Sequence, residues 1–268
     1  MAGTTPPMAE RLGAPTANPS PTPPSARRAS LARIDALLRA ADLPHTYRVL
    51  EAGGGAVTRF RLPGEPHITT LDISERQLAK NQYAHEKVRA DLESHEFPAS
   101  SFDLIICNNV LEHLRRPDKA LASLCRWTRP EGRLLIGAPN RRSMAGLVTR
   151  LTPHRFHVFA LRHILRDRNV SELGGYPFRT FLKPDMDFDR VRARLAAADF
   201  EVLHSARYES DRRERLAHRN PAAGAAYDAC MTMGRAVSLG RWRPELSDYH
   251  IVARRRPLAS EKKVHRTQ

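Results

Sequence analysis

The stretch Tyr47–Gly55 constrains the fold of this chain more than any other feature. It is a short apolar run that ends in the carboxylate Glu51 and continues after one alanine into three glycines. Such runs are typical of buried parallel strands, and a glycine turn lets the backbone pass close under a nucleotide. A second apolar run, 68–71, ends in Asp72 about twenty residues later, the spacing at which an acid receives a ribose. The two runs predict an α/β chain that binds an adenosine-type cofactor.

Strand and helix patterns alternate from residue 47 onward, which predicts a parallel sheet with right-handed crossovers. The run 102–107 is almost wholly apolar and should therefore be central. A helix over 30–41 is expected to precede the first strand. The later elements expected from periodicity and turn residues are strands at 48–51, 68–72, 87–91, 102–107, 133–138, 201–206 and 248–253, helices at 74–84, 118–128, 188–198 and 222–239, and a turn at 130–132 before the strand at 133–138.

Two segments depart from this alternation. The link from Gly55 to His67 is short and broken by Pro63, Gly64 and Pro66, so its crossover helix should be stunted. Residues 141–184 are basic and show no strand–helix alternation. They follow the fifth strand and so belong at the carboxyl edge of the sheet, where ligands bind in open α/β folds. We predict that they form a substrate lid.

Composition sets the outer limits of the domain. Residues 1–25 are rich in proline and poor in large apolar side chains, so we predict a disordered tail, a domain over 26–258 and a basic tail over 259–268.

The net charge of +15 can indicate binding to nucleic acid or to an anionic membrane. Because the cations are spread along the chain and aromatic residues are only 6%, a compositional origin is favoured. The three scattered cysteines suit a cytoplasmic protein.

The acid at the end of the first strand decides between cofactors. A dinucleotide site needs G-x-G-x-x-G, and the third glycine position here is Thr58. A pyrophosphate is disfavoured beside a carboxylate, and Glu51 would be such a neighbour. S-adenosylmethionine carries no phosphate, and its ammonium and sulfonium groups suit an acid. The sequence therefore predicts S-adenosylmethionine as the cofactor.

With these motifs the chain resembles the class I S-adenosylmethionine-dependent methyltransferases, in the small-molecule branch that includes ubiquinone-biosynthesis-like enzymes. The resemblance implies a Rossmann-like, doubly wound α/β sheet, mostly parallel with an antiparallel C-terminal strand and a lid insertion after strand five. The matching segments are VLEAGGG (49–55), TLDIS (70–74), ADL (90–92), FPASSFDLIICNNVLEHL (97–114) and RPEGRLLIGAPN (129–140).

The resemblance also implies roles for single residues. Glu51 and the glycines would surround the methionine moiety, Asp72 would hold both ribose hydroxyls, and Asp91 would accept from the adenine amino group. Asn108 would line the pocket beneath the sulfonium. The simpler alternative is that these are surface acids at strand ends or turn formers. The full expected cofactor set is Glu51, Gly53, Gly54, Gly55, Asp72, Ile73, Asp91, Leu92 and Asn108.

Three histidines are candidate catalytic residues. His113 follows the fourth strand, and a histidine can take a proton from a hydroxyl at neutral pH, although a structural role is the alternative. Glu112 and His113 alone would make a poor metal site, so no metal is expected. His154 and His157 lie in the expected lid, where they could orient or deprotonate an acceptor or belong to a solvated basic loop.

The expected reaction is methyl transfer to a small molecule, at a hydroxyl oxygen. Nucleic acid is a disfavoured substrate, because Asn108–Leu111 lacks the Asn- or Asp-Pro-Pro-aromatic motif of enzymes that methylate base amino groups. A non-catalytic binding protein on the same fold is a second alternative. The apolar stripe Met144, Leu147, Val148 and Leu151 indicates either core packing or a helix that makes transient contact with a membrane surface.

Overall fold

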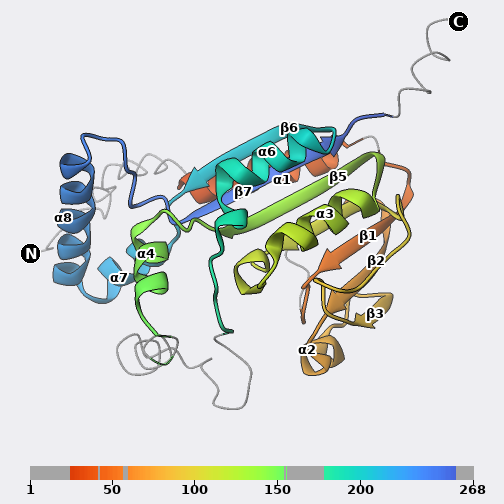
Figure 1. Cartoon of the computed structure of the whole chain (residues 1–268), viewed down its shortest axis with the longest axis horizontal. Coiled ribbons are helices and arrows are strands. Elements are labelled where there is room, and N and C mark those ends of the chain that lie inside the picture. Colours follow the sequence, from red (N-terminus) through yellow and green to blue (C-terminus); the bar gives the residue numbers. More distant parts are fainter. Residues whose placement is uncertain (1–24, 42, 57–59, 154, 156–177, 258–268) are drawn as a thin grey trace, which may run out of the picture.

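The computed structural model describes residues 25–41, 43–56, 60–153, 155 and 178–257. Its centre is a seven-stranded sheet in the order β3-β2-β1-β4-β5-β7-β6 (Figure 1). Strands β1 to β5 are parallel, whereas β7 pairs antiparallel with both β5 and β6. The mostly parallel sheet, its antiparallel C-terminal strand and the central place of β4 are thus confirmed. The strands are β1 (Thr46–Ala52), β2 (Glu65–Asp72), β3 (Glu86–Arg89), β4 (Phe102–Asn108), β5 (Thr128–Pro139), β6 (Phe200–Tyr208) and β7 (Asp248–Arg255).

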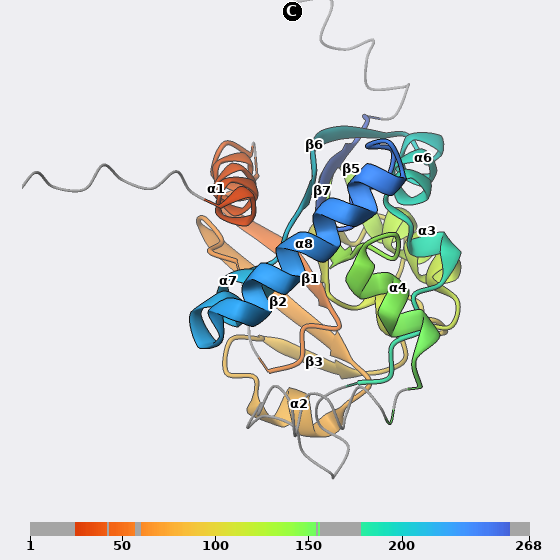
Figure 2. The same ribbon diagram turned by 90° about the vertical axis from the view of Figure 1, so that its left-hand side faces the viewer.

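Helices cover both faces of the sheet. In Figure 1, α3 and α6 lie in front of it, α1 lies behind, and α4, α7 and α8 gather at the left-hand end, which faces the viewer in Figure 2. Helix α7 was not predicted from the sequence. The helices are α1 (Ala26–Arg39), α2 (Glu75–Lys80), α3 (Pro117–Trp127), α4 (Met144–Leu151), α6 (Phe188–Ala197), α7 (Arg212–Arg219) and α8 (Pro221–Val237), with 3-10 turns η1 (Leu111–His113) and η3 (Pro184–Met186).

The strands are buried on both faces, as their continuous apolar runs require. Val49 and Leu50 are neighbours in β1 and are both fully buried, but they belong to different apolar clusters on opposite faces. Trp127 of α3 packs in the cluster with Leu50, and Ile34 of α1 packs in the cluster with Val49. The apolar faces of α1 and α3 therefore point inward, as their periodicity predicted.

The connection from β1 to β2 lacks the helix that usually follows such a strand. Its described residues, 53–56 and 60–64, contain no helix, which agrees with the predicted stunted crossover. Phe60 and Leu62 from this link pack instead on the same cluster as α1. The glycine turn is therefore continued by irregular, non-helical backbone in its described part, and other elements must hold it in place.

One predicted turn is wrong. Residues 130–132 were expected to separate α3 from the fifth strand, but β5 already begins at Thr128. Glu131 has a φ of 67°, and the pairing of β5 with β4 shifts register in this region. The proline and glycine thus produce an irregularity inside the strand, as a bulge does, and do not end it.

A buried polar network joins α1 to the antiparallel strands. His250 of β7 is 4% exposed, and its Nε2 lies 2.8 Å from the hydroxyl of Tyr208. Its Nδ1 lies 3.1 Å from the hydroxyl of Ser30, which is also 3.0 Å from Nε2 of His204. Burial, with a smaller contribution from His204, lowers the pKa of His250 to about 4. The native protein therefore keeps this ring neutral.

We expect this network to make the protein less stable in mild acid. Between about pH 6.5 and the lowered pKa, the unfolded chain binds a proton at residue 250 that the native state does not. The free energy of unfolding should therefore fall as pH falls through this window, by roughly 3 kcal/mol in total. Urea unfolding at several pH values checks this.

Two variants isolate the contribution of this one ring. His250→Gln should reduce the pH dependence of the unfolding free energy, whereas His218→Gln, at an exposed position of α7, should leave it unchanged. An acid limb of equal slope in wild type and His250→Gln would contradict the assignment.

Candidate active site

The glycine turn after β1 has a backbone conformation that other residues adopt only rarely. Gly53 and Gly55 have φ values of 68° and 55°, in the left-handed region that glycine tolerates. A Cβ atom on Gly53 would collide with the side chain of Val110. The amide of Gly53 donates to the carbonyl of Leu71 at 2.7 Å, which ties the turn to the end of β2.

The two predicted strand-end carboxylates border this same turn. A Cβ placed on Gly54 would lie 3.1 Å from Oε2 of Glu51, and one placed on Gly55 would lie 3.6 Å from Oδ2 of Asp72. Glu51 is 3% exposed, while Asp72 is half-buried. Oδ1 of Asp72 accepts from the amide of Ser74 at 2.8 Å, which orients its carboxylate. Two acids from neighbouring strands thus flank consecutive glycines, as the sequence predicted.

Asn81 supports the turn and was missed by sequence reasoning. It is 2% exposed, and its Nδ2 donates to the carbonyl of Gly55 at 2.9 Å. Its Oδ1 accepts from the amides of Tyr83 and Ala84, so α2 ends at Lys80, and the predicted extension of this helix to residue 84 is wrong. An asparagine after a helix is a recognisable turn signal. Its contact with a glycine 26 residues away is not readable from the sequence.

The predicted adenine end of the site is more open. Ile73 is 68% exposed, which is unusual for a large apolar side chain beside a ribose-binding acid and suits a flat ring packed on it. Leu92 is buried in the core. Asp91 is exposed, and its Oδ1 accepts from the amide of Glu93 at 2.9 Å. Asp91 therefore forms a turn, and its adenine contact stays a prediction.

Asn108, at the carboxyl end of β4, faces the neighbouring strand. A Cβ on Gly137 would collide with its Oδ1, so the side chain lies against the backbone of β5. The next residue, Asn109, has a φ of 57° and donates its amide to the carbonyl of Gly137 at 2.7 Å. Contact between Asn108 and the cofactor stays a prediction.

His113 has one ring nitrogen bound and the other available. Nδ1 lies 2.9 Å from the carbonyl oxygen of Arg179, and because a carbonyl only accepts, Nδ1 carries the proton. Nε2 then holds the lone pair and lies 3.8 Å from Oε1 of Glu112. Burial lowers the pKa of His113, partly opposed by the bond to Arg179. The ring is therefore neutral at pH 7, the state that a general base needs.

Comparison with known proteins places this geometry in a family. Residues 48–136 match the model of a methyltransferase domain family. The ubiquinone biosynthesis O-methyltransferase of Aromatoleum aromaticum is 27% identical over 150 residues, which are 51% of this chain and 58% of that protein. The mitochondrial enzyme of the same name from Schizosaccharomyces pombe is 29% identical over 100 residues, 37% of this chain and 32% of that protein.

The fold agrees with a solved structure. The YcgJ protein of Bacillus subtilis superimposes with a TM-score of 0.50 at 15% identity, over 86% of this chain and all of that one. Residues 48–136 carry a class I S-adenosylmethionine-dependent methyltransferase domain. This confirms the family resemblance and S-adenosylmethionine as the cofactor of the domain, which Glu51, Asp72 and the glycine turn fit. The chain spans 58% and 32% of the lengths of the two curated relatives.

The expected lid of the methyltransferase is described only in part. His154 and His157 lie outside the described residues. Helix α4 forms as the apolar stripe predicted, with Val148 and Leu151 45% and 74% exposed. A lipid contact of this helix stays a prediction. Across the described ranges, no helix combines the length and apolar character that crossing a membrane requires.

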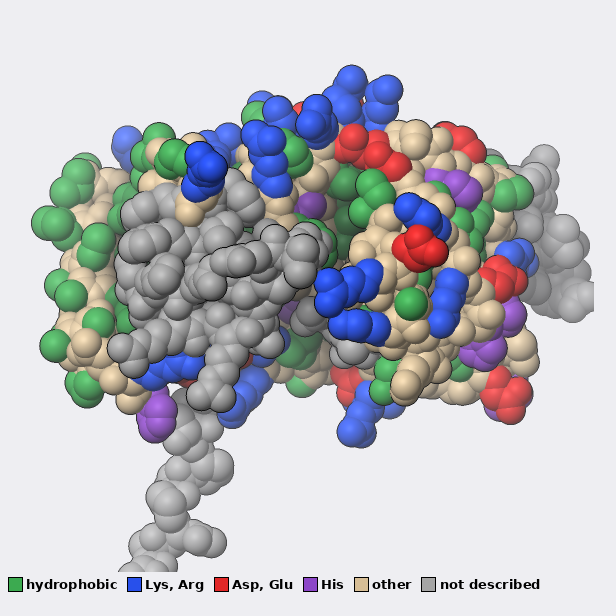
Figure 3. Space-filling model, turned by 90° about the horizontal axis from the view of Figure 1, so that it is seen from below, with side chains coloured by type: hydrophobic (Ala, Val, Ile, Leu, Met, Phe, Trp, Pro, Cys, Tyr) green, Lys and Arg blue, Asp and Glu red, His purple; other side chains and the backbone are tan. Residues whose placement is uncertain are grey.

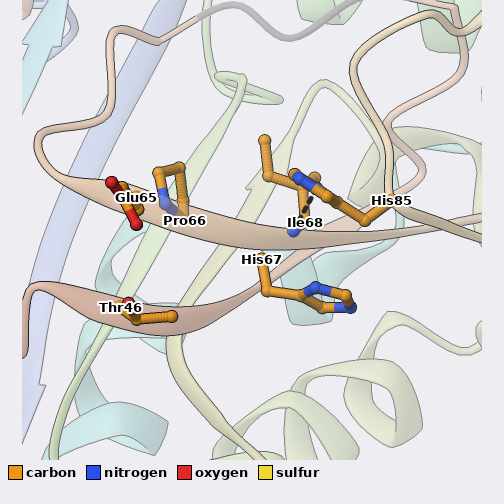
Figure 4. Close-up of a pocket in the computed structure, with 6 residues that line it drawn as sticks. All are labelled: Thr46, Glu65, Pro66, His67, Ile68 and His85. Atoms are coloured by element: carbon orange, nitrogen blue, oxygen red, sulfur yellow. Dashed lines mark hydrogen bonds between the residues drawn. The ribbon is translucent and has the colours of Figure 1, made fainter.

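A hollow lies at the edge of the sheet opposite to the glycine turn. It is open and lies at the amino ends of β1 and β2, lined by Thr46, Glu65, Pro66, His67, Ile68 and His85 (Figure 4). The amide of Ile68 donates to Nδ1 of His85 at 3.1 Å, so this ring is held by the backbone. Cofactors in open α/β sheets bind at the carboxyl ends. We therefore place the active site at the glycine turn.

Proposed function

We propose that this methyltransferase transfers a methyl group to a hydroxyl oxygen of a small molecule. The observation that carries the proposal is the convergence of Glu51 and Asp72 on one glycine turn. A buried carboxylate beside such a turn suits the α-ammonium of S-adenosylmethionine and disfavours a phosphate. A second carboxylate, on the neighbouring strand, suits two ribose hydroxyls.

The choice of oxygen rests on His113 and on the curated relatives. S-adenosylmethionine supplies a methyl group that is already activated, so the protein must align the acceptor and remove its proton. Nε2 of His113 takes the hydroxyl proton, and the carbonyl of Arg179 stabilises the charged ring through Nδ1–H. The relatives from A. aromaticum and S. pombe are named O-methyltransferases, which supports the same acceptor atom here.

Thermal unfolding with S-adenosylhomocysteine tests the proposal. Ligand at about a hundred times its dissociation constant should stabilise the native state by roughly 2.7 kcal/mol and raise the melting temperature. Adenosine diphosphate at equal concentration serves as the matched control, because its pyrophosphate would meet Glu51. If S-adenosylhomocysteine at millimolar concentration left the melting temperature unchanged, the chain would be a binding scaffold on this fold.

A further inference from the structure

A short segment connects the proposed base to the end of β5. Residues 178–182, here called the strap, lie beside η1: the amides of Phe181 and Leu182 point to the carbonyl of Glu112, at 2.7 and 3.4 Å. The strap carbonyl of Arg179 accepts from His113, and the ring of Phe178 meets the imidazole edge-on, with centroids 5.7 Å apart. The strap therefore holds the acceptor side of the site.

Arg141 is bound to the other end of the same strap. It lies two residues after the end of β5, and its Nε donates to the carbonyl of Leu182 at 3.2 Å. The side chain is half-buried. Its terminal Nη groups form no ion pair or hydrogen bond with the described residues. Nε of the guanidinium is thus fixed by the backbone, while none of the four N–H donors on its two Nη groups is used by the described residues, which leaves them for a ligand.

The positive charge around Arg141 is only weakly compensated. Burial lowers its pKa, and Arg150, Arg142 and Arg190 lower it further, against an opposing contribution from Asp187. The carboxylate of Asp187 is already paired with Arg142, because its Oδ2 lies 2.6 Å from Nε of Arg142. A partly buried cation among like charges is costly unless an anion joins it.

Two more cations flank the strap. The guanidinium groups of Arg115 and Arg179 lie 5.7 and 5.2 Å from the ring centroid of Phe181. Neither forms an ion pair within the part of the chain that the structure describes. Figure 3, viewed from below Figure 1, shows Lys and Arg side chains gathered near the middle of this face. The acceptor side of the site is therefore electropositive.

We propose that Arg141 binds an anionic group of the methyl acceptor, so that the acceptor is a hydroxy compound bearing a carboxylate or a phosphate. This inference rests on the proposed function, because it places the acceptor between His113 and Arg141. A guanidinium binds either anion through two parallel hydrogen bonds, which fixes the orientation of the ligand. The anion supplies countercharge to the arginine cluster.

Binding of simple anions to the protein saturated with S-adenosylhomocysteine tests the inference. The probes are benzoate, phenyl phosphate and the neutral benzamide, measured by calorimetry. At least one anion should bind at least about tenfold more tightly than benzamide, as expected for charge-assisted hydrogen bonds. The tighter of the two anions identifies the acid group as carboxylate or phosphate.

Variants of the cluster locate the effect. Arg141→Gln should abolish the tenfold discrimination, and Arg141→Lys should restore part of it, because the charge returns without the two-pronged geometry. Arg190→Gln, in the same cluster but 4.0 Å from Asp185, should retain it. Should Arg141→Gln fail to bind S-adenosylhomocysteine, the contrast between Arg141→Lys and Arg190→Gln decides.

Other outcomes separate this inference from the proposed function. Equal binding of all three probes, or discrimination that survives Arg141→Gln, would overturn the anionic acceptor and leave the methyltransferase assignment standing. Failure of the wild-type protein to bind S-adenosylhomocysteine would instead overturn the proposed function.

Discussion

Replacing Asp72 by alanine is expected to lower the affinity for S-adenosylhomocysteine at least about a hundredfold while the protein stays folded. The carboxylate lies beside Gly55, where it can accept from both ribose hydroxyls. Hydrogen bonds to a charged group contribute about 1.5–3 kcal/mol each, so losing two exceeds the roughly 2.7 kcal/mol that a hundredfold requires. Titration calorimetry measures the change.

The fold should tolerate this substitution, for reasons visible in the structure. Asp72 is half-buried, and its intramolecular bond to the amide of Ser74 is one of several in this turn. The cap of α2, in which the Ser74 hydroxyl accepts from the amide of Gln77, does not involve the carboxylate. Asp72→Asn, which keeps an acceptor for Ser74, separates loss of charge from loss of the turn.

An exposed acid on the next helix provides the control. Glu75 begins α2 and pairs with Arg89 at the surface, so Glu75→Ala should leave cofactor affinity unchanged. An Asp72→Ala protein that binds S-adenosylhomocysteine as tightly as wild type would remove the ribose role, and with it the argument from converging carboxylates.

Replacing His113 by asparagine is expected to lower kcat by about a hundredfold to ten-thousandfold, the range that general bases contribute. Asparagine can still donate to the carbonyl of Arg179 and so keep the strap in place, but it cannot accept the hydroxyl proton. Methyl transfer from labelled S-adenosylmethionine to a panel of hydroxybenzoates measures the rate. Affinity for S-adenosylhomocysteine should not change.

The pH profile distinguishes this base role from a structural one. Burial lowers the pKa of His113, so the wild-type rate should fall with decreasing pH only below the ordinary histidine value. The acid limb reports protonation of Nε2 and should be absent from the residual rate of His113→Asn. If His113→Asn turned over at the wild-type rate, the histidine would serve only to anchor the strap.

The sequence predicted the frame of this site because the frame depends on local patterns. Apolar runs locate β1 and β2 in the sequence, and Glu51 and Asp72 are then identified as residues near the carboxyl ends of these strands. The amino-acid pattern alone therefore predicts that the two side chains lie close together. The stunted crossover followed equally from Pro63 and Pro66.

The missed features all depend on contacts between distant segments. Asn81 holds Gly55 through a side-chain bond, and the strap reaches His113 from residue 179, 66 positions away. Neither has a periodicity or a spacing that points to its partner. The turn expected at 130–132 was wrong for a similar reason, because pairing with β4 draws these residues into the sheet.

The position of β7 has a consequence for the order in which this protein can assemble. β7 is the last strand in the described part of the chain, yet it lies inside the sheet, hydrogen-bonded to β5 on one side and β6 on the other. Until residues 248–255 have left the ribosome, the edge of β5 stays open and β6 has no neighbour to join. Completion of the sheet must therefore follow synthesis of all its other strands, and a chain that stops short of β7 would expose the unpaired edge of β5 to other nascent proteins.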